Sequence, residues 1–263
     1  MTGPLQRFLQ HVSTGDPREM SFFDHLEELR WQIVKALIGF LVATAVCVYF
    51  SDFLVRDVLL GPLRVIGLKL QVLSPYGKVM LYMEAVLIAA FIISMPYTLY
   101  ALWKFVAPGL LPRERRYISL IVIFTSLCFF AGVAFAYVVL IPAALQFFST
   151  FGAPEIELNI AVDQYVSFML ALLLGAGLVF ELPMISYFLT KMGLITPAFL
   201  RKYRRHAIVV ILIVAAIVTP TPDMVTQTLL ALPMFALYEI SIFVSYFARR
   251  NKERRSSQEA TGA

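Results

Sequence analysis

Two neighbouring glutamates stand at the start of a long apolar stretch, where a carboxylate could bind a cation. In "SFFDHLEELRWQIVKAL", Ser21 and Asp24 have the spacing of a capping box, which predicts that a helix begins at Ser21. The apolar residues that follow recur every three or four positions, and Glu27 and Glu28 fall off the face that they form. In one interpretation this is a solvated face on which Glu27 pairs with Arg30. In the other, a carboxylate is presented at the membrane surface to bind a cation.

A further acidic candidate lies in "KFVAPGLLPRERR", the stretch 104–116 that joins two apolar runs. Its prolines and glycine predict a stiff turn, because proline fixes φ and disfavours helix at the residue before it. Glu114 then lies near the start of the next helix, where the helix dipole favours an anion. Either this carboxylate has a binding function, or it simply balances the arginines around it.

Another acidic candidate, Glu181 in "GLVFELPMISYF", lies inside an apolar run. An ionisable side chain at membrane depth is costly and is by default a functional candidate. Pro183 frees backbone groups nearby, with which the carboxylate could pair. The alternatives are a protonated Glu181 that is hydrogen-bonded to another helix, and a position closer to the membrane interface.

Polar residues also follow a proline-rich turn in "TPTPDMVTQTLLALP", residues 219–233. They are Asp223, Thr226, Gln227 and Thr228. Gln227 would lie within the membrane, where a polar group can hydrogen-bond another transmembrane helix with about 0.6–2 kcal/mol. That helix belongs either to a partner or to this chain, in which case the contact is ordinary intramolecular packing.

Catalytic and metal-binding patterns are absent from the sequence. The three histidines, His11, His25 and His206, lie outside the apolar runs, and neither an H-E-x-x-H nor a G-x-G-x-x-G pattern occurs. Cys47 and Cys128 lie in apolar runs without metal-site spacing. We therefore expect no enzyme, no cofactor and no metal site.

The elements that position these residues are membrane helices. Hydrophobic residues make up 60% of the 263 residues and charged residues 15%, against about 25% in soluble globular chains. Several apolar runs approach the ~20 residues that a helix needs to cross a bilayer, whereas a β-barrel would alternate polar and apolar residues. We predict an all-α polytopic membrane protein with six transmembrane helices, at 31–50, 79–103, 117–140, 162–189, 207–219 and 226–247.

Three of these spans carry a further prediction. The third is expected to end before Pro142, and the fourth is expected to be interrupted by "ELP" at Glu181 to Pro183. The fifth, "AIVVILIVAAIVT", has only 13 residues, which span about 20 Å against a hydrocarbon core of ~30 Å. Either this span is short and is accommodated by its neighbours or by a thinner bilayer, or the preceding "RKYRRH" is helical too.

The basic residues orient the chain, because Lys and Arg concentrate on the cytoplasmic side of membrane proteins. With a cytoplasmic N-terminus, only four of the 22 basic residues fall on the outer side: Arg56, Arg64, Lys69 and Lys78. Both termini should then be cytoplasmic, and the net charge of +5 reflects topology rather than nucleic-acid binding. We expect a cytoplasmic segment at 1–20, a six-helix domain at 21–248 and a basic disordered tail at 249–263 that lies against anionic lipid.

Five stretches of the sequence together resemble one known family. They run in order from about Ser21 to Phe247: "FFDHLEELRWQI", "YALWKFVAPGLLPRERR", "AFAYVVLIPAALQFF", "FELPM" and "TPTPDMVTQTLLALPMFALYEI". In these stretches the chain is similar to TatC, the membrane-embedded core of the twin-arginine protein translocase. The resemblance implies six helices in a concave, glove-like bundle with both termini in the cytoplasm, in agreement with the charge distribution.

The resemblance also implies a function. TatC-like proteins are receptors for signal peptides that carry two consecutive arginines, and they direct folded proteins across the bacterial inner membrane with energy from the proton-motive force. The implied partners are single-span subunits of the TatA and TatB type and other TatC copies.

Candidate site residues follow from the resemblance, position by position. Glu28 and Glu114 match the signal-binding carboxylates, and each could engage one guanidinium of an arginine pair through bidentate bonds that lysine cannot make. Arg30 and Phe105 match residues of the same cytoplasmic surface, and Glu181 matches the intramembrane acid. The other matches are two outer-loop residues and two residues of a polar site that meets a partner helix: Pro62, Asp223, Gln227 and Thr226.

Two other functions are open at this point. A proton-coupled transporter of small solutes would use Glu181, but the sequence shows neither internal repeats nor other acids at membrane depth. A purely structural membrane scaffold would bind arginine-pair peptides no better than lysine-pair peptides. The residues and the resemblance together favour a non-enzymatic receptor for protein translocation.

Overall fold

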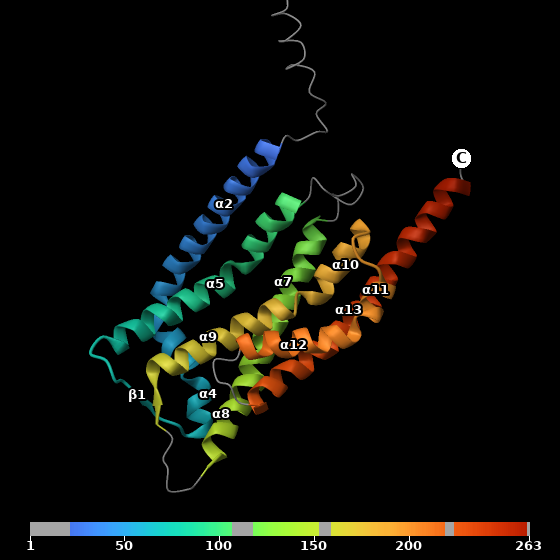
Figure 1. Cartoon of the computed structure of the whole chain (residues 1–263). Coiled ribbons are helices and arrows are strands. Elements are labelled where there is room, and N and C mark those ends of the chain that lie inside the picture. Colours follow the sequence, from blue (N-terminus) through green and yellow to red (C-terminus); the bar gives the residue numbers. More distant parts are fainter. Residues whose placement is uncertain (1–21, 107–117, 153–158, 219–223, 262–263) are drawn as a thin grey trace, which may run out of the picture.

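The computed structural model describes four stretches of the chain: 22–106, 118–152, 159–218 and 224–261. Helices make up nearly all of them and lie side by side in one bundle (Figure 1). The first is α2 (Phe22–Tyr49), an uninterrupted helix that packs along α5 (Gly77–Val106). These two helices correspond to the spans predicted at 31–50 and 79–103, and α2 begins directly after Ser21, as the capping box predicted.

The connection between α2 and α5 lies at one end of the bundle. A short α3 (Ser51–Phe53), the π-helical turn η1 (Leu54–Leu59) and α4 (Gly61–Ile66) lead to the strand β1 (Leu70–Gln71). This strand pairs in parallel with β2 (Ile160–Ala161), with Leu70 opposite Ile160. The two-stranded sheet therefore joins this connection to the segment that enters α9, the helix that begins at Val162.

The third span is longer than predicted. α7 (Ile118–Phe135) continues through a π-helical turn, η3 (Ala136–Leu140), into α8 (Ile141–Thr150). The prediction that the helix ends before Pro142 is therefore wrong. Pro142 lies in the first turn of α8, directly after the wider π turn, and such a turn relieves the clash between a proline ring and the carbonyl four residues earlier.

The fourth span is broken near its middle, as the "ELP" sequence predicted. α9 (Val162–Val179) and α10 (Leu182–Met192) are separated at Phe180 and Glu181. α9 runs through the centre of the bundle and carries several of the largest fully buried side chains, Tyr165 and Met169 among them. The main core forms where these side chains meet the inward faces of η3, α8 and η1.

The last helices form the remaining side of the bundle. The fifth span is split: α11 (Pro197–Lys202) precedes α12 (Arg204–Val218), so part of "RKYRRH" is helical but belongs to two helices. α13 runs from Met224 to Thr261, and its backbone is helical through the tail for which disorder was predicted. Glycine and proline, which would end a helix, are absent between Arg249 and Thr261, and arginine, lysine and glutamate favour helix there.

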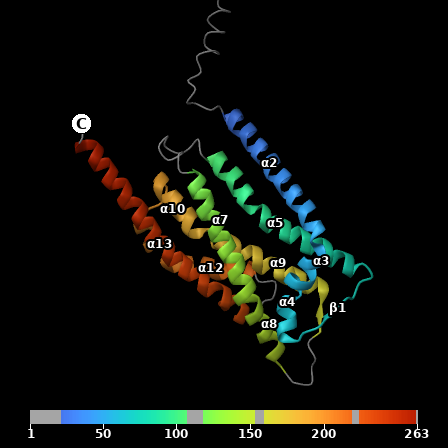
Figure 2. The same cartoon turned by 180° about the vertical axis from the view of Figure 1, so that it is seen from behind.

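Five helical stretches of the described chain are long and apolar enough to cross a membrane: His25–Tyr49, Gly77–Val106, Ser119–Thr150, Val162–Met192 and Met224–Arg249. α12 is the sixth apolar helix, and its 15 residues span only about 22 Å. At one end of the bundle lie the start of α2 and the ends of α5 and α10, and at the other lie α4, α8 and β1 (Figures 1 and 2).

Candidate functional site

The start of α2 and the end of α5 are joined by two stacked rings. The imidazole of His25 and the phenyl ring of Phe105 lie nearly parallel, with centroids 4.3 Å apart and planes 16° apart. Phe105 was a candidate from the sequence, whereas His25 was missed. The signal that could have found it is its spacing: His25 precedes Glu28 by three residues and so lies on the same helix face.

Glu28 and Glu27 differ in their surroundings. Glu27 and Arg30 are exposed and approach each other at 3.5 Å, which is the solvated ion pair that one interpretation predicted. Glu28 is partly buried, and its Oε2 atom is inaccessible and has no hydrogen-bond partner among the described residues. An acceptor without a donor is costly when buried, so a donor that reached this oxygen would relieve that cost.

The end of α5 is held in place by a second aromatic contact. The rings of Trp103 and Phe188 on α10 meet edge to face, with centroids 4.6 Å apart. Trp103 is buried, as is Phe188, so α5 is anchored one half-turn before Phe105. The stacked pair and the Glu28 carboxylate therefore lie on packed helices rather than on a free loop.

Two candidates lie outside the described residues. Glu114 falls in the stretch 107–117 and Asp223 in the stretch 219–223, so the distance between the Glu114 and Glu28 carboxylates stays a prediction. The last described residue before the first of these stretches is Val106, directly after Phe105. The chain that carries Glu114 therefore leaves α5 next to the stacked rings.

Glu181 lies at the junction between α9 and α10, apart from the Glu28 group. Its side chain is 5% exposed, and its Oε1 atom has no hydrogen-bond partner among the described residues. Its backbone carbonyl accepts a hydrogen bond from the amide of Ile185 at 2.9 Å. Glu181 lies inside the apolar helical stretch Val162–Met192, and the expectation that another helix would hydrogen-bond this carboxylate is not met at Oε1.

Gln227 and Thr226 lie near the start of α13. The Gln227 side-chain amide donates to the backbone carbonyl of Leu212 on α12 at 3.0 Å, so this group joins two helices of the same chain. Thr226 is 2% exposed and lies inside the bundle. The intramolecular alternative therefore accounts for the Gln227 amide, and a contact with a partner helix stays a prediction.

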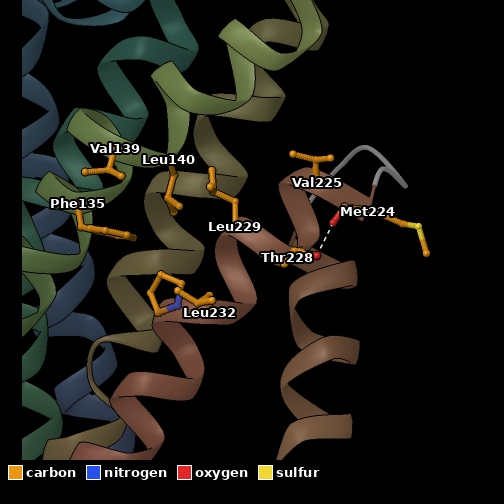
Figure 3. Close-up of a pocket in the computed structure, with 9 residues that line it drawn as sticks. Phe135, Val139, Leu140, Met224, Val225, Thr228, Leu229 and Leu232 are labelled. Carbon is orange, nitrogen blue, oxygen red and sulfur yellow. Dashed lines mark hydrogen bonds between the residues drawn. The ribbon is translucent and has the colours of Figure 1, made fainter. Parts of the chain in front are cut away.

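An apolar hollow lies beside the start of α13. It has a volume of about 660 Å³ and is lined from the end of α7, η3 and α13, with Phe135, Leu140 and Leu229 among its walls (Figure 3). Its one hydroxyl, on Thr228, donates to the carbonyl of Met224 and is satisfied within the chain. Only apolar groups would gain by entering it.

Pro62 lies in the first turn of α4, at the end of the bundle opposite Glu28, and is buried. Its fixed φ suits a helix start, which accounts for the residue structurally. Within the described stretches, no group of three or more His, Cys, Asp or Glu side chains could hold a metal ion. The described candidates thus fall into four separate places: Glu28 with Phe105, Glu181, Gln227, and Pro62.

Comparison with known proteins decides between the functions left open by the sequence. A sequence model of the family described as "Sec-independent protein translocase protein (TatC)" matches residues 24–233, most of the chain. The chain belongs to the TatC family. TatC proteins are components of the Sec-independent, twin-arginine protein translocase, so the resemblance predicted from the sequence is confirmed and the solute-transporter alternative is disfavoured.

Relatives of similar length support the assignment. The TatC protein of Carboxydothermus hydrogenoformans is 35% identical over 234 residues, which cover 89% of this chain and 96% of that protein. TatC of Helicobacter pylori (strain ATCC 700392 / 26695) is 42% identical over 224 residues, which cover 84% of this chain and 85% of that protein. A TatC crystal structure described as the twin-arginine translocase receptor superposes with a TM-score of 0.76 at 35% identity, covering 85% of this chain and 99% of that one. The chain therefore has the TatC fold and is an all-α polytopic membrane protein.

Proposed function

We propose that this TatC protein is the receptor that recognises twin-arginine signal peptides at the cytoplasmic face of the bacterial inner membrane. It then directs folded cargo to export driven by the proton-motive force, without catalytic chemistry of its own. One observation carries the proposal: the inaccessible Oε2 of Glu28 has no donor within the described chain and lies one helical turn from the stacked His25 and Phe105 rings.

Arginine fits such a place better than lysine. A guanidinium is planar and permanently charged, and its fork of donors can bond both oxygens of a carboxylate while its face lies against an aromatic ring. A lysine ammonium offers a point charge without that fork. The carboxylate of Glu28 and the nearby phenyl ring of Phe105 therefore supply the two features that distinguish arginine.

Binding an arginine pair needs more than one carboxylate. An exposed ion pair contributes only about 0–1 kcal/mol, so one surface contact would not select a signal peptide. We assign the second arginine to Glu114, whose stretch leaves α5 directly after the site, and the two pairs would have to be partly desolvated. Arg30 is paired with Glu27. We assign to Arg30 the role of keeping the Glu27 carboxylate from competing with Glu28 for an arginine of the signal peptide.

The orientation of the chain rests on its charges. The start of α2, the end of α5 and the end of α10 lie at one end of the bundle. These helix ends carry Arg30, Lys104 and Lys191. We place this end in the cytoplasm, with Pro62 and Asp223 on the outer side, because basic residues are retained on the cytoplasmic side. A signal peptide on its way out would meet the Glu28 site first.

The partners that we propose are single-span subunits of the TatA and TatB type and further TatC copies. The apolar hollow between η3 and α13 could receive the apolar helix of such a subunit, and it lies beside the polar pair Thr226 and Gln227. Glu181 is another polar group within an apolar helical stretch, and its Oε1, unpartnered among the described residues, could accept a donor from a partner helix during transport.

Photocrosslinking tests the receptor site. A twin-arginine signal peptide with a photoreactive group next to the arginine pair is added to membrane vesicles that contain the full-length chain. Glu28→Gln is expected to lower crosslinking about tenfold or more, because it removes a charge-assisted hydrogen bond. The double variant Glu28→Gln/Glu114→Gln should abolish it.

Glu27→Gln is the matched control. It removes the same charge one residue away from Glu28, from a carboxylate that is already paired with Arg30. It should leave crosslinking nearly unchanged, and a lysine-pair peptide should crosslink weakly to the unchanged chain. Retained crosslinking in the double variant, or equal crosslinking of the lysine-pair peptide, would reject the receptor site.

A further inference from the structure

The connection from α10 to α12 carries an unbalanced positive charge. Five basic residues lie between Glu181 and Asp223, and acidic residues are absent from that interval of the sequence: Lys191, Arg201, Lys202, Arg204 and Arg205. Arg204 pairs with Glu239 on α13. Arg201 and Arg205 are exposed and make no ion pair with any described residue. The charge of this connection is therefore directed outward.

Aromatic rings are interleaved with these charges. Phe199 and Tyr203 stack at 4.6 Å between centroids, and Tyr203 meets His206 at 5.4 Å. The Lys202 ammonium lies 5.9 Å from the Tyr203 ring centre. Phe199 is 49% exposed and Tyr203 39%, so neither ring is needed to fill the core. Exposed rings among exposed cations form an amphipathic surface.

This surface is held rigidly against α13. The Thr196 hydroxyl accepts the amide of Phe199 at 3.1 Å and caps α11. The Tyr238 hydroxyl on α13 donates to the carbonyl of Leu200 at 2.6 Å. Together with the pair between Arg204 and Glu239, these contacts hold one side of the connection against α13. The side chains on its other side are exposed.

We propose that Phe199, Arg201, Lys202, Tyr203 and Arg205, here called the basic–aromatic elbow, form a binding surface for anionic phospholipid headgroups. The apolar helix α12 continues directly from the elbow, with Ala207 following His206, so the elbow must lie at the level of the headgroups. Aromatic rings are favoured at that level, and clustered Lys and Arg attract anionic lipid.

A lipid fits the elbow better than another macromolecule does. The rings and the cations alternate on one short, fixed segment, so rings can enter the acyl boundary while the charges stay among the phosphates. α12 is too short to cross a ~30 Å hydrocarbon core alone, and a short span is accommodated by snorkelling flanks and a locally thinned bilayer. Bound headgroups at the elbow would hold the leaflet at the position that α12 requires.

Native mass spectrometry tests the proposal on the full-length chain in a mild detergent that contains phosphatidylglycerol and phosphatidylcholine in equal amounts. The unchanged chain should retain phosphatidylglycerol preferentially. Arg201→Gln/Lys202→Gln/Arg205→Gln should weaken that retention at least about tenfold, because each basic group near a phosphate adds to the attraction. Phe199→Ala/Tyr203→Ala should weaken it by a smaller factor.

The control removes the same charge elsewhere: Arg64→Gln/Lys69→Gln/Lys78→Gln, three exposed residues at the opposite end of the bundle. It should keep the preference, and the thermal unfolding midpoints of both triple variants should match, which excludes misfolding. Equal losses in the two triple variants, equal retention of both lipids, or an elbow variant that loses a copurifying acidic protein instead of lipid would each overturn the proposal. Signal-peptide crosslinking at Glu28 should be retained in the elbow variant, so the two proposals fail independently.

In bilayers, Phe199→Trp provides a second measurement. Brominated phosphatidylglycerol in vesicles should quench the added tryptophan fluorescence more strongly than brominated phosphatidylcholine does. The chain with only Trp31 and Trp103 serves as the reference. Equal quenching by the two lipids would contradict a specific headgroup interaction at the elbow.

Discussion

His25 at the start of α2 and Phe105 at the end of α5 form a nearly parallel ring stack, with 4.3 Å between centroids and 16° between planes. Eighty positions of sequence separate them, so this contact fixes how two distant segments meet at the site. An aromatic pair contributes about 0.5–1.5 kcal/mol beyond its buried area. The stack therefore positions Glu28, one turn further along α2, relative to the stretch that carries Glu114.

Replacement of His25 tests this positioning role. His25→Ala should weaken binding of a twin-arginine peptide by about two- to tenfold, since it removes the stack but no charge-bearing ligand. His25→Phe keeps a stacking ring and should restore binding. The measurement is the Kd from a fluorescence titration of labelled peptide. Unchanged binding in His25→Ala, or no recovery in His25→Phe, would contradict the role.

Glu181 is predicted to serve transport and not stability. Its buried Oε1 is unpartnered among the described residues, and a buried polar atom without a partner costs about 1–3 kcal/mol, so Glu181→Leu should leave the free energy of unfolding unchanged or raise it. The same change should abolish export of a twin-arginine reporter, because the carboxylate is lost. Thermal unfolding in detergent and reporter export are the two measurements.

Glu239→Leu is the matched comparison for Glu181. Its carboxylate pairs with Arg204, so the same substitution removes a real contact and should lower the unfolding midpoint. If Glu181→Leu lowered the midpoint as much as Glu239→Leu does, the Glu181 carboxylate would have a structural role.

Two tyrosine hydroxyls fasten the end of η1 to the bundle. Tyr165 donates to the carbonyl of Leu59 at 2.6 Å, and Tyr137 donates to the adjacent carbonyl of Val58 at 2.8 Å. Carbonyls at a helix end have no partner within the helix, so these hydroxyls satisfy them. Tyr165→Phe should lower the free energy of unfolding by about 0.6–1.7 kcal/mol, the range for hydrogen bonds between membrane helices.

Tyr137→Phe should cost less than Tyr165→Phe, because Tyr165 is fully buried whereas Tyr137 is partly exposed. Chemical or thermal unfolding of both variants in the same detergent gives the comparison. Equal costs, or no cost for Tyr165→Phe, would show that other groups hold η1 in place.

Local patterns predicted the features that depend on local physics. The capping box located the start of α2, apolar runs located the spans, and the "ELP" sequence located the break near Glu181. Contacts between residues on different helices of the bundle were not predicted, because the periodicity of a sequence does not encode them. The stack of His25 on Phe105 and the bond from Gln227 to the Leu212 carbonyl are of this kind.

Pro142 shows the limit of a local rule. Proline normally ends or kinks a helix, and that rule predicted the end of the third span. The π-helical turn before it absorbs the misfit, and side chains buried from other helices stabilise that turn, so the outcome depends on tertiary packing.

Gly132 on α7 is predicted to set the distance between α7 and α9. A Cβ at this position would lie 2.6 Å from the backbone oxygen of Ala176, which is fixed by a hydrogen bond from the amide of Phe180. Gly132→Ala should therefore lower the free energy of unfolding by about 1–3 kcal/mol, as overpacking does. Leu127→Ala, at a 63% exposed position of the same helix, is the control and should change it little. Because the obstacle is backbone, adding Phe180→Ala should not rescue Gly132→Ala; recovery in that double variant would show that the ring, not the Ala176 carbonyl, limits the approach of the helices.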